Sequence, residues 1–141
     1  MLNKFWLSAA SLMIFVSSLG AQQPPAVDPL NDLMFPPELV MARQNAIGLS
    51  EAQKTYLRAE VLKAQTRFTE LQWQLQSDME GLIGLLKQSK ADEAQVAAQL
   101  DKVLASEREI KRAQISLLVR IKNDLTEEQQ HRLRALRGES K

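Results

Sequence analysis

Two long amphipathic stretches, separated by only a few residues, constrain this fold more than any other feature of the sequence. The first runs from Ser50 to about Gln88 and the second from about 92 to 123, with a predicted turn at Ser89-Lys90-Ala91. In both, apolar residues recur at alternating spacings of four and three, the heptad-like pattern of a helix with one buried side. Because the connection is so short, we expect the two helices to pack as an antiparallel hairpin.

The same spacing predicts which side chains form the buried seam of the hairpin. In the first helix the pattern skips Asp78, and Gly81 and Gly84 indicate a bend, early fraying or close packing near its end. In the second helix the polar residues Glu107 and Gln114 fall on seam positions. They could set the register of the two helices, mark a hydrated gap, or lie at the edge of a buried face that Leu104, Ile115 and Leu118 widen. We favour the third interpretation. The predicted seam residues are Leu57, Val61, Ala64, Phe68, Leu71, Leu75 and Leu82, then Val96, Leu100, Val103, Ile110, Leu117 and Ile121.

Shorter segments flank the hairpin and complete a helical domain over residues 38–137. After Pro36-Pro37 the sequence predicts a short helix of about three turns that Gly48 closes. After Asn123-Asp124-Leu125 a fourth helix is expected over about 127–137, and residues 138–141 are expected to fray. At about 1.5 Å per residue the hairpin would be roughly 55 to 60 Å long, so an elongated, all-α, four-helix molecule is predicted.

The N-terminal residues have the pattern of an export signal. Residues 1–21 carry Lys4, an apolar run and then small residues that suit cleavage after Gly20 or Ala21. The run falls short of the roughly 18 to 20 apolar residues that spanning needs, so a cleaved signal is favoured over a retained anchor, and no stable membrane insertion is expected after cleavage. Residues 22–37 form a proline-rich arm that either docks on the helices or presents an apolar strip.

Composition excludes several functional classes. The chain has no Cys, so it has neither a disulfide framework nor a thiolate metal site. Cleavage would remove one of 18 basic residues and leave 17 against 17 acidic ones, a balance that argues against nucleic-acid binding. No nucleophile, acid–base pair or phosphate loop is assembled, so neither enzyme activity nor a cofactor is expected.

One short pattern occurs twice, each time at a predicted helix start. It reads Leu49-Ser50-Glu51-Ala52-Gln53 and then Leu125-Thr126-Glu127-Glu128-Gln129. In each copy the hydroxyl can accept from the backbone N–H three residues on, while the Gln reaches back to the N–H of the cap, which is a capping box. We assign Leu49, Ser50, Gln53, Leu125, Thr126 and Gln129 to closing helix ends and pinning the short helices to the hairpin.

This doubled pattern resembles the LTxxQ repeat of the Spy/CpxP family, with Ser50 in place of Thr in the first copy. The resemblance covers roughly residues 36 to 137. It implies a periplasmic protein whose two copies pair into a cradle, and it implies an ATP-independent chaperone that holds unfolded or misfolded proteins during envelope stress. The best-known cradles are basic, whereas this mature chain is neutral.

Apolar and adaptable side chains are the candidates for client contact. They are Phe35, Met41, Trp73, Met79 and Leu86. For Trp73 and Met79 the alternative is burial in a dimer interface or in the hairpin core.

Other functions fit the same helical scaffold. The resemblance also includes regulators that bind the periplasmic domain of a membrane signalling protein, and metal-responsive relatives with His-rich ligand sets. Here His131, near Glu127 and Glu128 at helical spacing, is the only His, and a solvated side chain is the favoured interpretation. A helical dimer with a purely structural role is the third possibility.

Overall fold

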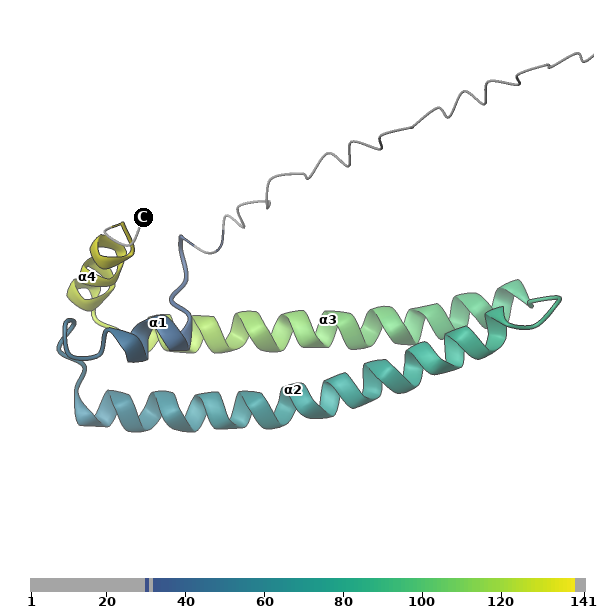
Figure 1. The fold of residues 1–141 in the computed structure, drawn as a ribbon, viewed down its shortest axis with the longest axis horizontal. Coiled ribbons are helices and arrows are strands. Elements are labelled where there is room, and N and C mark those ends of the chain that lie inside the picture. Colours follow the sequence, from purple (N-terminus) through teal and green to yellow (C-terminus); the bar gives the residue numbers. More distant parts are fainter. Residues whose placement is uncertain (1–29, 31, 139–141) are drawn as a thin grey trace, which may run out of the picture.

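The computed structural model describes residues 30 and 32–138, and within them the chain is all-α. Its four helices are α1 (Pro37–Ala42), α2 (Glu51–Leu86), α3 (Glu93–Asp124) and α4 (Glu127–Gly138) (Figure 1). The predicted all-α, four-helix class is therefore confirmed. The predicted signal peptide (1–21), most of the predicted arm and the last three residues lie outside the described residues.

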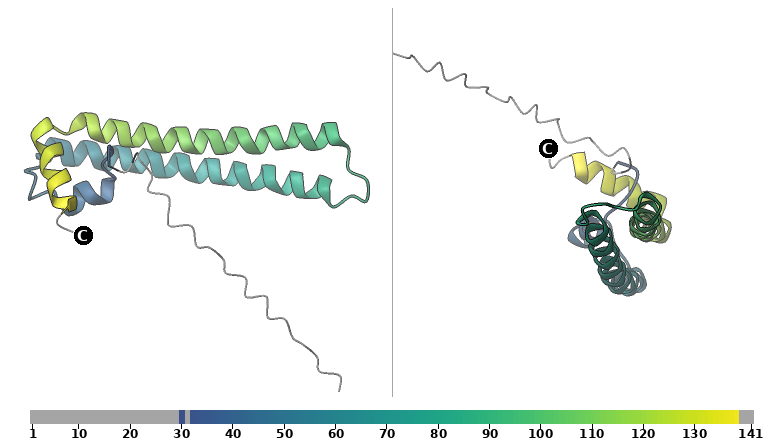
Figure 2. Two further views of the ribbon diagram at one scale, coloured as in Figure 1. Left: turned by 90° about the horizontal axis from the view of Figure 1, so that it is seen from above. Right: turned by 90° about the vertical axis from the view of Figure 1, so that its right-hand side faces the viewer.

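The long hairpin is confirmed, and its helices end within about two residues of the predicted bounds. Helices α2 and α3 lie side by side and antiparallel along the whole length of the molecule (Figures 1 and 2). Helix α2 begins after the Ser50 cap, and α3 begins after Asp92, whose carboxylate accepts from the Gln95 N–H at 3.0 Å. These polar caps fix where each long helix starts because they satisfy N–H groups that have no partner inside the helix.

The first short helix is shorter than predicted. It covers only six residues, and the chain then runs through turns to Gly48, whose φ of 66° is in the left-handed region that glycine tolerates. Val40 and Leu49 are both buried although nine residues separate them. In a continuous helix these two side chains would point in opposite directions, so the helix must end early to bury both.

The hairpin seam contains a polar pair, Asp78 and Ser106, at the point where the apolar pattern of the first helix was predicted to skip Asp78. Asp78 is buried, and its carboxylate accepts from the Ser106 hydroxyl of α3 at 2.8 Å and from the Gln74 amide at 3.1 Å. The seam of α3 therefore passes through Ser106, and Glu107 is exposed. A shifted α3 would leave the Asp78 carboxylate without this donor, so the pair favours the observed register.

Two other expectations for the seam are resolved by the packing. The prediction that Leu104 widens the buried face is wrong, because Leu104 is exposed, whereas Ile115 and Leu118 are half-buried. Close packing explains Gly81, where a Cβ atom would lie 2.7 Å from the Gln99 amide nitrogen that donates to the Asp78 carbonyl of α2.

The hydrophobic core lies at one end of the hairpin, where residues 34–49 and α4 pack against it. Phe35 is fully buried there, beneath the guanidinium groups of Arg134 and Arg137 at 5.5 and 5.7 Å from its ring centre. Arg137 also donates to the Met34 carbonyl at 2.8 Å. The other core residues are Val40, Ile47, Leu49, Leu57, Leu117, Ile121, Leu125 and Leu133.

An ion pair between the buried Glu60 and the exposed Arg120 also joins the two long helices. The Glu60 carboxylate accepts from Arg120 of α3 at 2.6 Å and from Lys63 at 2.9 Å. The hydrogen bond from Lys63 and then that from Arg120 hold the pKa of Glu60 below its ordinary value of 4.5. In the unfolded chain the carboxyl group has the ordinary pKa, so it binds protons at a higher pH than in the folded protein.

We therefore expect Glu60 to stabilise the fold fully above about pH 4.5, and this stabilisation to be lost as the pH falls through the lower pKa of the folded state. Replacing Glu60 with Gln should flatten the acid limb of a plot of unfolding free energy against pH. Urea unfolding at several pH values measures this. The pKa of Glu51 is also lowered, by Lys54, and this group titrates in the unaltered protein and in Glu60→Gln alike. It therefore contributes equally to the pH dependence of both unfolding free energies. An acid limb of unchanged steepness in Glu60→Gln would contradict the assignment.

Candidate functional site

Both copies of the repeated pattern form the predicted capping boxes. The Ser50 hydroxyl accepts from the Gln53 N–H at 3.1 Å, and the Gln53 side-chain oxygen accepts from the Ser50 N–H at 3.0 Å. The second copy repeats this geometry, with 3.2 Å from the Gln129 N–H to the Thr126 hydroxyl and 3.0 Å for the return bond. Each box satisfies two backbone donors at a helix start.

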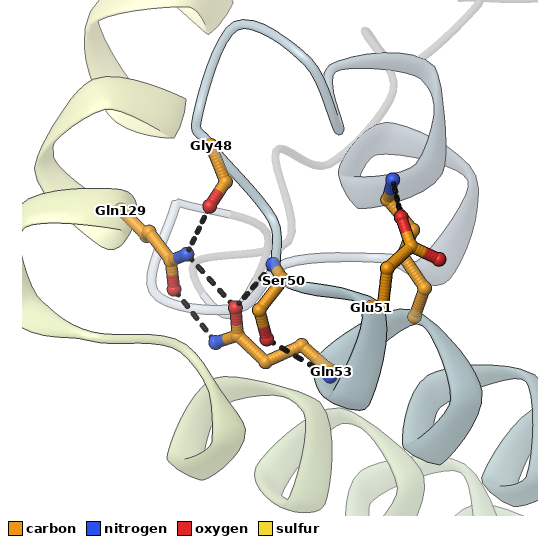
Figure 3. A network of polar contacts seen from close by, with 6 residues as sticks. Gly48, Ser50, Glu51, Gln53 and Gln129 are labelled. Atoms are coloured by element: carbon orange, nitrogen blue, oxygen red, sulfur yellow. Dashed lines mark hydrogen bonds and ion pairs between the residues drawn. The ribbon is translucent and has the colours of Figure 1, made fainter.

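The two boxes also bind each other, which the sequence analysis did not predict. The amide of Gln53 donates to the side-chain oxygen of Gln129 at 2.8 Å, and the amide of Gln129 donates back at 3.0 Å (Figure 3). Each amide also reaches the carbonyl just before the other motif, at Asp124 (2.7 Å) and Gly48 (3.3 Å). This reciprocal pairing joins the start of α2 to the start of α4.

The side chains of this paired site are suited to a structural role. Its amides are neutral and bonded to each other and to backbone groups, and Leu49 and Leu125, the first residues of the two motifs, are buried. The adjacent Asp124 has one buried carboxylate oxygen without a hydrogen-bond partner among the described residues, and burial raises the pKa of this carboxyl group. An uncharged, fully bonded pair of amides suits a role in fixing α4 to the hairpin.

The predicted client-contact residues lie in three different environments. The expected exposure of Phe35 is wrong, because its ring is in the core. Met41 is half-buried and lines a groove of about 450 Å³ between α1 and α2, together with Pro37 and Leu57. Trp73, Met79 and Leu86 are exposed, which excludes burial of Trp73 and Met79 in the hairpin core. Whether any of them binds a client stays a prediction.

One side of the hairpin carries an apolar surface that continues from the core end towards the tip. Near the core end, Phe68 of α2 and Ile115 and Leu118 of α3 line one groove with Met34 and Pro36. The segment that precedes α1 thus lies on this side of the hairpin. It is a short apolar stretch without regular secondary structure.

Nearer the tip, the same side exposes four apolar residues. On α2, Met79 lies about three turns beyond Phe68, and Leu86 lies about five turns beyond it. On α3, Leu104 lies about three turns before Ile115, and Leu100 lies about five turns before Leu118. Residues a whole number of turns apart lie on the same side of a helix, so all four residues lie on this side of the hairpin. We call this surface the distal apolar face, and it consists of Met79, Leu86, Leu100 and Leu104.

His131 lies exposed on α4. Of the two acidic neighbours on this helix, Glu128 forms an ion pair with Arg132. Across residues 30 and 32–138, no three side chains of the His, Cys, Asp or Glu type gather closely enough to hold a metal ion.

Comparison with known proteins gives one match. A family model described as heavy-metal resistance matches residues 7–132, and this family belongs to the Spy/CpxP-like group of all-helical periplasmic proteins. No curated protein and no solved structure matches the chain. Members of the matching family are typically periplasmic. None of the helices in the described part of the chain is both long and apolar enough to span a membrane.

Proposed function

This chain belongs to the heavy-metal resistance family, and from that premise we propose that it is a periplasmic chaperone that holds unfolded proteins without ATP. The observation that carries the proposal is the distal apolar face. Leu86 and Leu104 expose 57% and 51% of their surface, and Met79 and Leu100 lie on the same side of the hairpin. A contiguous apolar surface of this kind on a soluble protein marks a site of interaction.

The N-terminal segment illustrates what this side of the hairpin can bind. Met34 and Pro36 lie in the groove beside Ile115 and Leu118, without helix or strand structure. An unfolded client presents the same kind of segment, which is extended, locally apolar and interrupted by polar residues. The flexible Met79 side chain adapts to irregular partners, which suits the binding of many different clients.

Suppression of the aggregation of reduced insulin, without nucleotide, tests the proposal. The purified protein is expected to protect near stoichiometric ratios, and the double variant Leu86→Ser/Leu104→Ser is expected to need several-fold more protein for the same effect. Tyr56→Ser/Val119→Ser is the matched control, because it also removes one exposed apolar residue from each long helix, outside the distal apolar face. Absence of protection at several-fold excess would contradict the proposal.

The regulatory alternative makes a different prediction. A protein that keeps one membrane sensor inactive should capture a single stoichiometric partner and leave unrelated unfolded proteins unprotected. Cross-linking in cells that express the protein, followed by mass spectrometry, separates this result from the capture of many clients.

The family match favours heavy-metal binding as a second candidate. Imidazole and carboxylate groups suit Zn²⁺, Ni²⁺ and Co²⁺, but Arg132 engages Glu128 and leaves His131 with Glu127 as the pair on this helix. Two ligands from one helix hold a divalent ion weakly. We expect calorimetric titration with the three metals to show no submicromolar binding, and submicromolar binding that His131→Ala abolishes would reverse this conclusion.

A further inference from the structure

The segment before α1 meets the hairpin about halfway along α2 and runs from there towards the core end. Leu30 and Met34 line a groove of about 380 Å³ together with Phe68, near the middle of α2. Further along the chain, Met41 lines another groove with Leu57, about three turns nearer the start of α2. The chain thus follows α2 in the reverse direction, and α1 points to the core end (Figure 1). Residues that continue this line before Leu30 would pass over the half of the hairpin that carries the distal apolar face.

The distal apolar face begins directly beyond this groove. Met79 lies about three turns beyond Phe68 on α2. Leu104 of α3 lies at the same level, because Asp78, the neighbour of Met79, bonds to Ser106 of α3. Both Met79 and Leu104 are exposed. The groove that holds a segment of this chain thus leads into the exposed apolar surface.

Residues 22–29, which we call the leading segment, directly precede Leu30 and would stay on the chain after the predicted cleavage. They lie outside the described residues, and their sequence is Gln-Gln-Pro-Pro-Ala-Val-Asp-Pro. The prolines favour the polyproline II form, which rises about 3.1 Å per residue and needs no internal hydrogen bonds. Because proline restricts the chain before it docks, such a segment loses less conformational entropy on a groove than a flexible one does. The leading segment thus has the composition of a ligand for an apolar groove.

The groove also holds a cation that suits the leading segment. Lys111 of α3 lines it beside Leu30, and among the described residues no acidic group pairs with the Lys111 ammonium group. Asp28 is the only charged residue of the leading segment and lies two positions before Leu30. An ion pair between Asp28 and Lys111 would therefore fix the register of the leading segment at the start of the distal apolar face.

The lengths of the two elements agree with this register. The helical rise puts Leu104 about 10 Å beyond Lys111 along α3. With Asp28 beside Lys111, the polyproline II rise puts Pro24-Pro25 about 9 to 12 Å beyond the same point. The two proline rings would then lie over Leu104 and, on the neighbouring helix, over Met79.

We propose that the leading segment docks on the distal apolar face of its own chain, with Asp28 beside Lys111 and Pro24-Pro25 over Met79 and Leu104. It then occupies the surface that a client would bind, and a client has to displace it. Because the segment is tethered, its effective concentration at the face is of millimolar order, so even weak docking competes with a client. This control of client affinity rests on the proposed function, whereas the docking itself does not.

Cysteine cross-linking tests the docked position in a chain that has no natural Cys. Ala26 would lie about 6 Å beyond Asp28, and the exposed Glu107 lies about 6 Å beyond Lys111 on the same side of α3. Mild oxidation of Ala26→Cys/Glu107→Cys should therefore give an intramolecular disulfide. Ala26→Cys/Gln65→Cys is the matched control, because the exposed Gln65 lies towards the core end of α2, where only an undocked segment would reach. The control should oxidise several-fold more slowly.

Charge exchange at the predicted ion pair tests what the docked segment covers. Nile red, an uncharged dye that fluoresces on apolar surfaces, should give roughly two- to fivefold more fluorescence with Asp28→Lys than with the unaltered protein, because repulsion from Lys111 releases the leading segment. Asp28→Lys/Lys111→Asp restores opposite charges and should return the fluorescence to the unaltered value. Asp28→Lys should also protect reduced insulin at a lower ratio of protein to client. Circular dichroism verifies that each variant is folded.

Three results would overturn the docking. They are equal oxidation of the two cysteine pairs, unchanged dye fluorescence in Asp28→Lys, and a double exchange that stays as fluorescent as the single one. Failure of the proposed function would give a different pattern. Cross-linking and dye fluorescence would still follow the leading segment, but no variant would protect insulin.

Discussion

Replacing Phe35 with Ala is expected to lower the free energy of unfolding by about 3 to 5 kcal/mol, the usual cost of emptying a phenylalanine site in a core. The ring is fully buried between the hairpin and α4, and the guanidinium groups of Arg134 and Arg137 lie over it. Its removal leaves a cavity beneath both arginines and weakens the packing of the segment before α1 on α4, which keeps the hydrogen bond from Arg137 to the Met34 carbonyl. Urea unfolding followed by circular dichroism measures the loss.

The local consequence of this substitution can be measured separately. Trypsin should cleave α4 at Arg132, Arg134 and Arg137 faster in Phe35→Ala than in the unaltered protein, because α4 loses a packing partner. Phe35→Leu keeps most of the volume and should cost about 1 kcal/mol. If Phe35→Ala left both unfolding and proteolysis unchanged, the aromatic ring would not be part of the core, and the original prediction of a client contact would regain its basis.

Replacing Gln129 with Ala is expected to cost about 2 to 4 kcal/mol, since it removes one half of a capping box and also the bonds to Gln53 and Gly48. The half-buried side-chain amide of Gln53 then loses both bonds to Gln129 and keeps those to the Asp124 carbonyl and the Ser50 N–H. Thr126→Ala, which removes only the hydroxyl acceptor, should cost about 1 kcal/mol. Urea midpoints at constant slope give these differences.

A double-mutant cycle isolates the contact between the two boxes. Gln53→Ala and Gln129→Ala should be non-additive by roughly 1 to 2 kcal/mol, because each single variant already breaks the shared amide pair. Gln76→Ala is the matched control, as Gln76 bonds only Glu80 of its own helix, and it should change stability by less than about 0.5 kcal/mol and add to either variant. Strict additivity of Gln53→Ala and Gln129→Ala would show that the boxes act independently.

Local sequence patterns predicted the helices well because the signals that start and end them are themselves local. Ser50 and Thr126 begin helices through bonds to residues three positions away, and Gly48 ends a segment through its own backbone conformation. The seam could also be followed at its apolar positions, except that the prediction for Leu100 is wrong: Leu100 is exposed, and the neighbouring Gln99 faces α2 and donates to the Asp78 carbonyl. Asp78 was misinterpreted because its partner, Ser106, comes from the other helix, and one helix alone does not reveal a shared polar pair.

The errors at the functional surfaces have the same origin. Phe35 lies in an arm for which the sequence left both docking on the helices and exposure open, and the packing of α4 against residues 34 and 35 explains why it is buried. Gln53 and Gln129 could be recognised in the sequence as equivalent positions of a repeated motif. The repeat alone does not show that its two copies bond to each other. Contacts between segments far apart in sequence decide both cases.

The concentration of the core at one end of the hairpin has a consequence for motion. Residues 35–57 pack there with residues 117–133, whereas nearer the tip the two helices have only each other. Backbone amides near the tip should therefore exchange with solvent through brief local openings, while those near the core exchange only when the whole domain unfolds. The exposed leucines near the tip thus sit on the part of the scaffold that can deform most cheaply around an irregular partner, without loosening the anchored end.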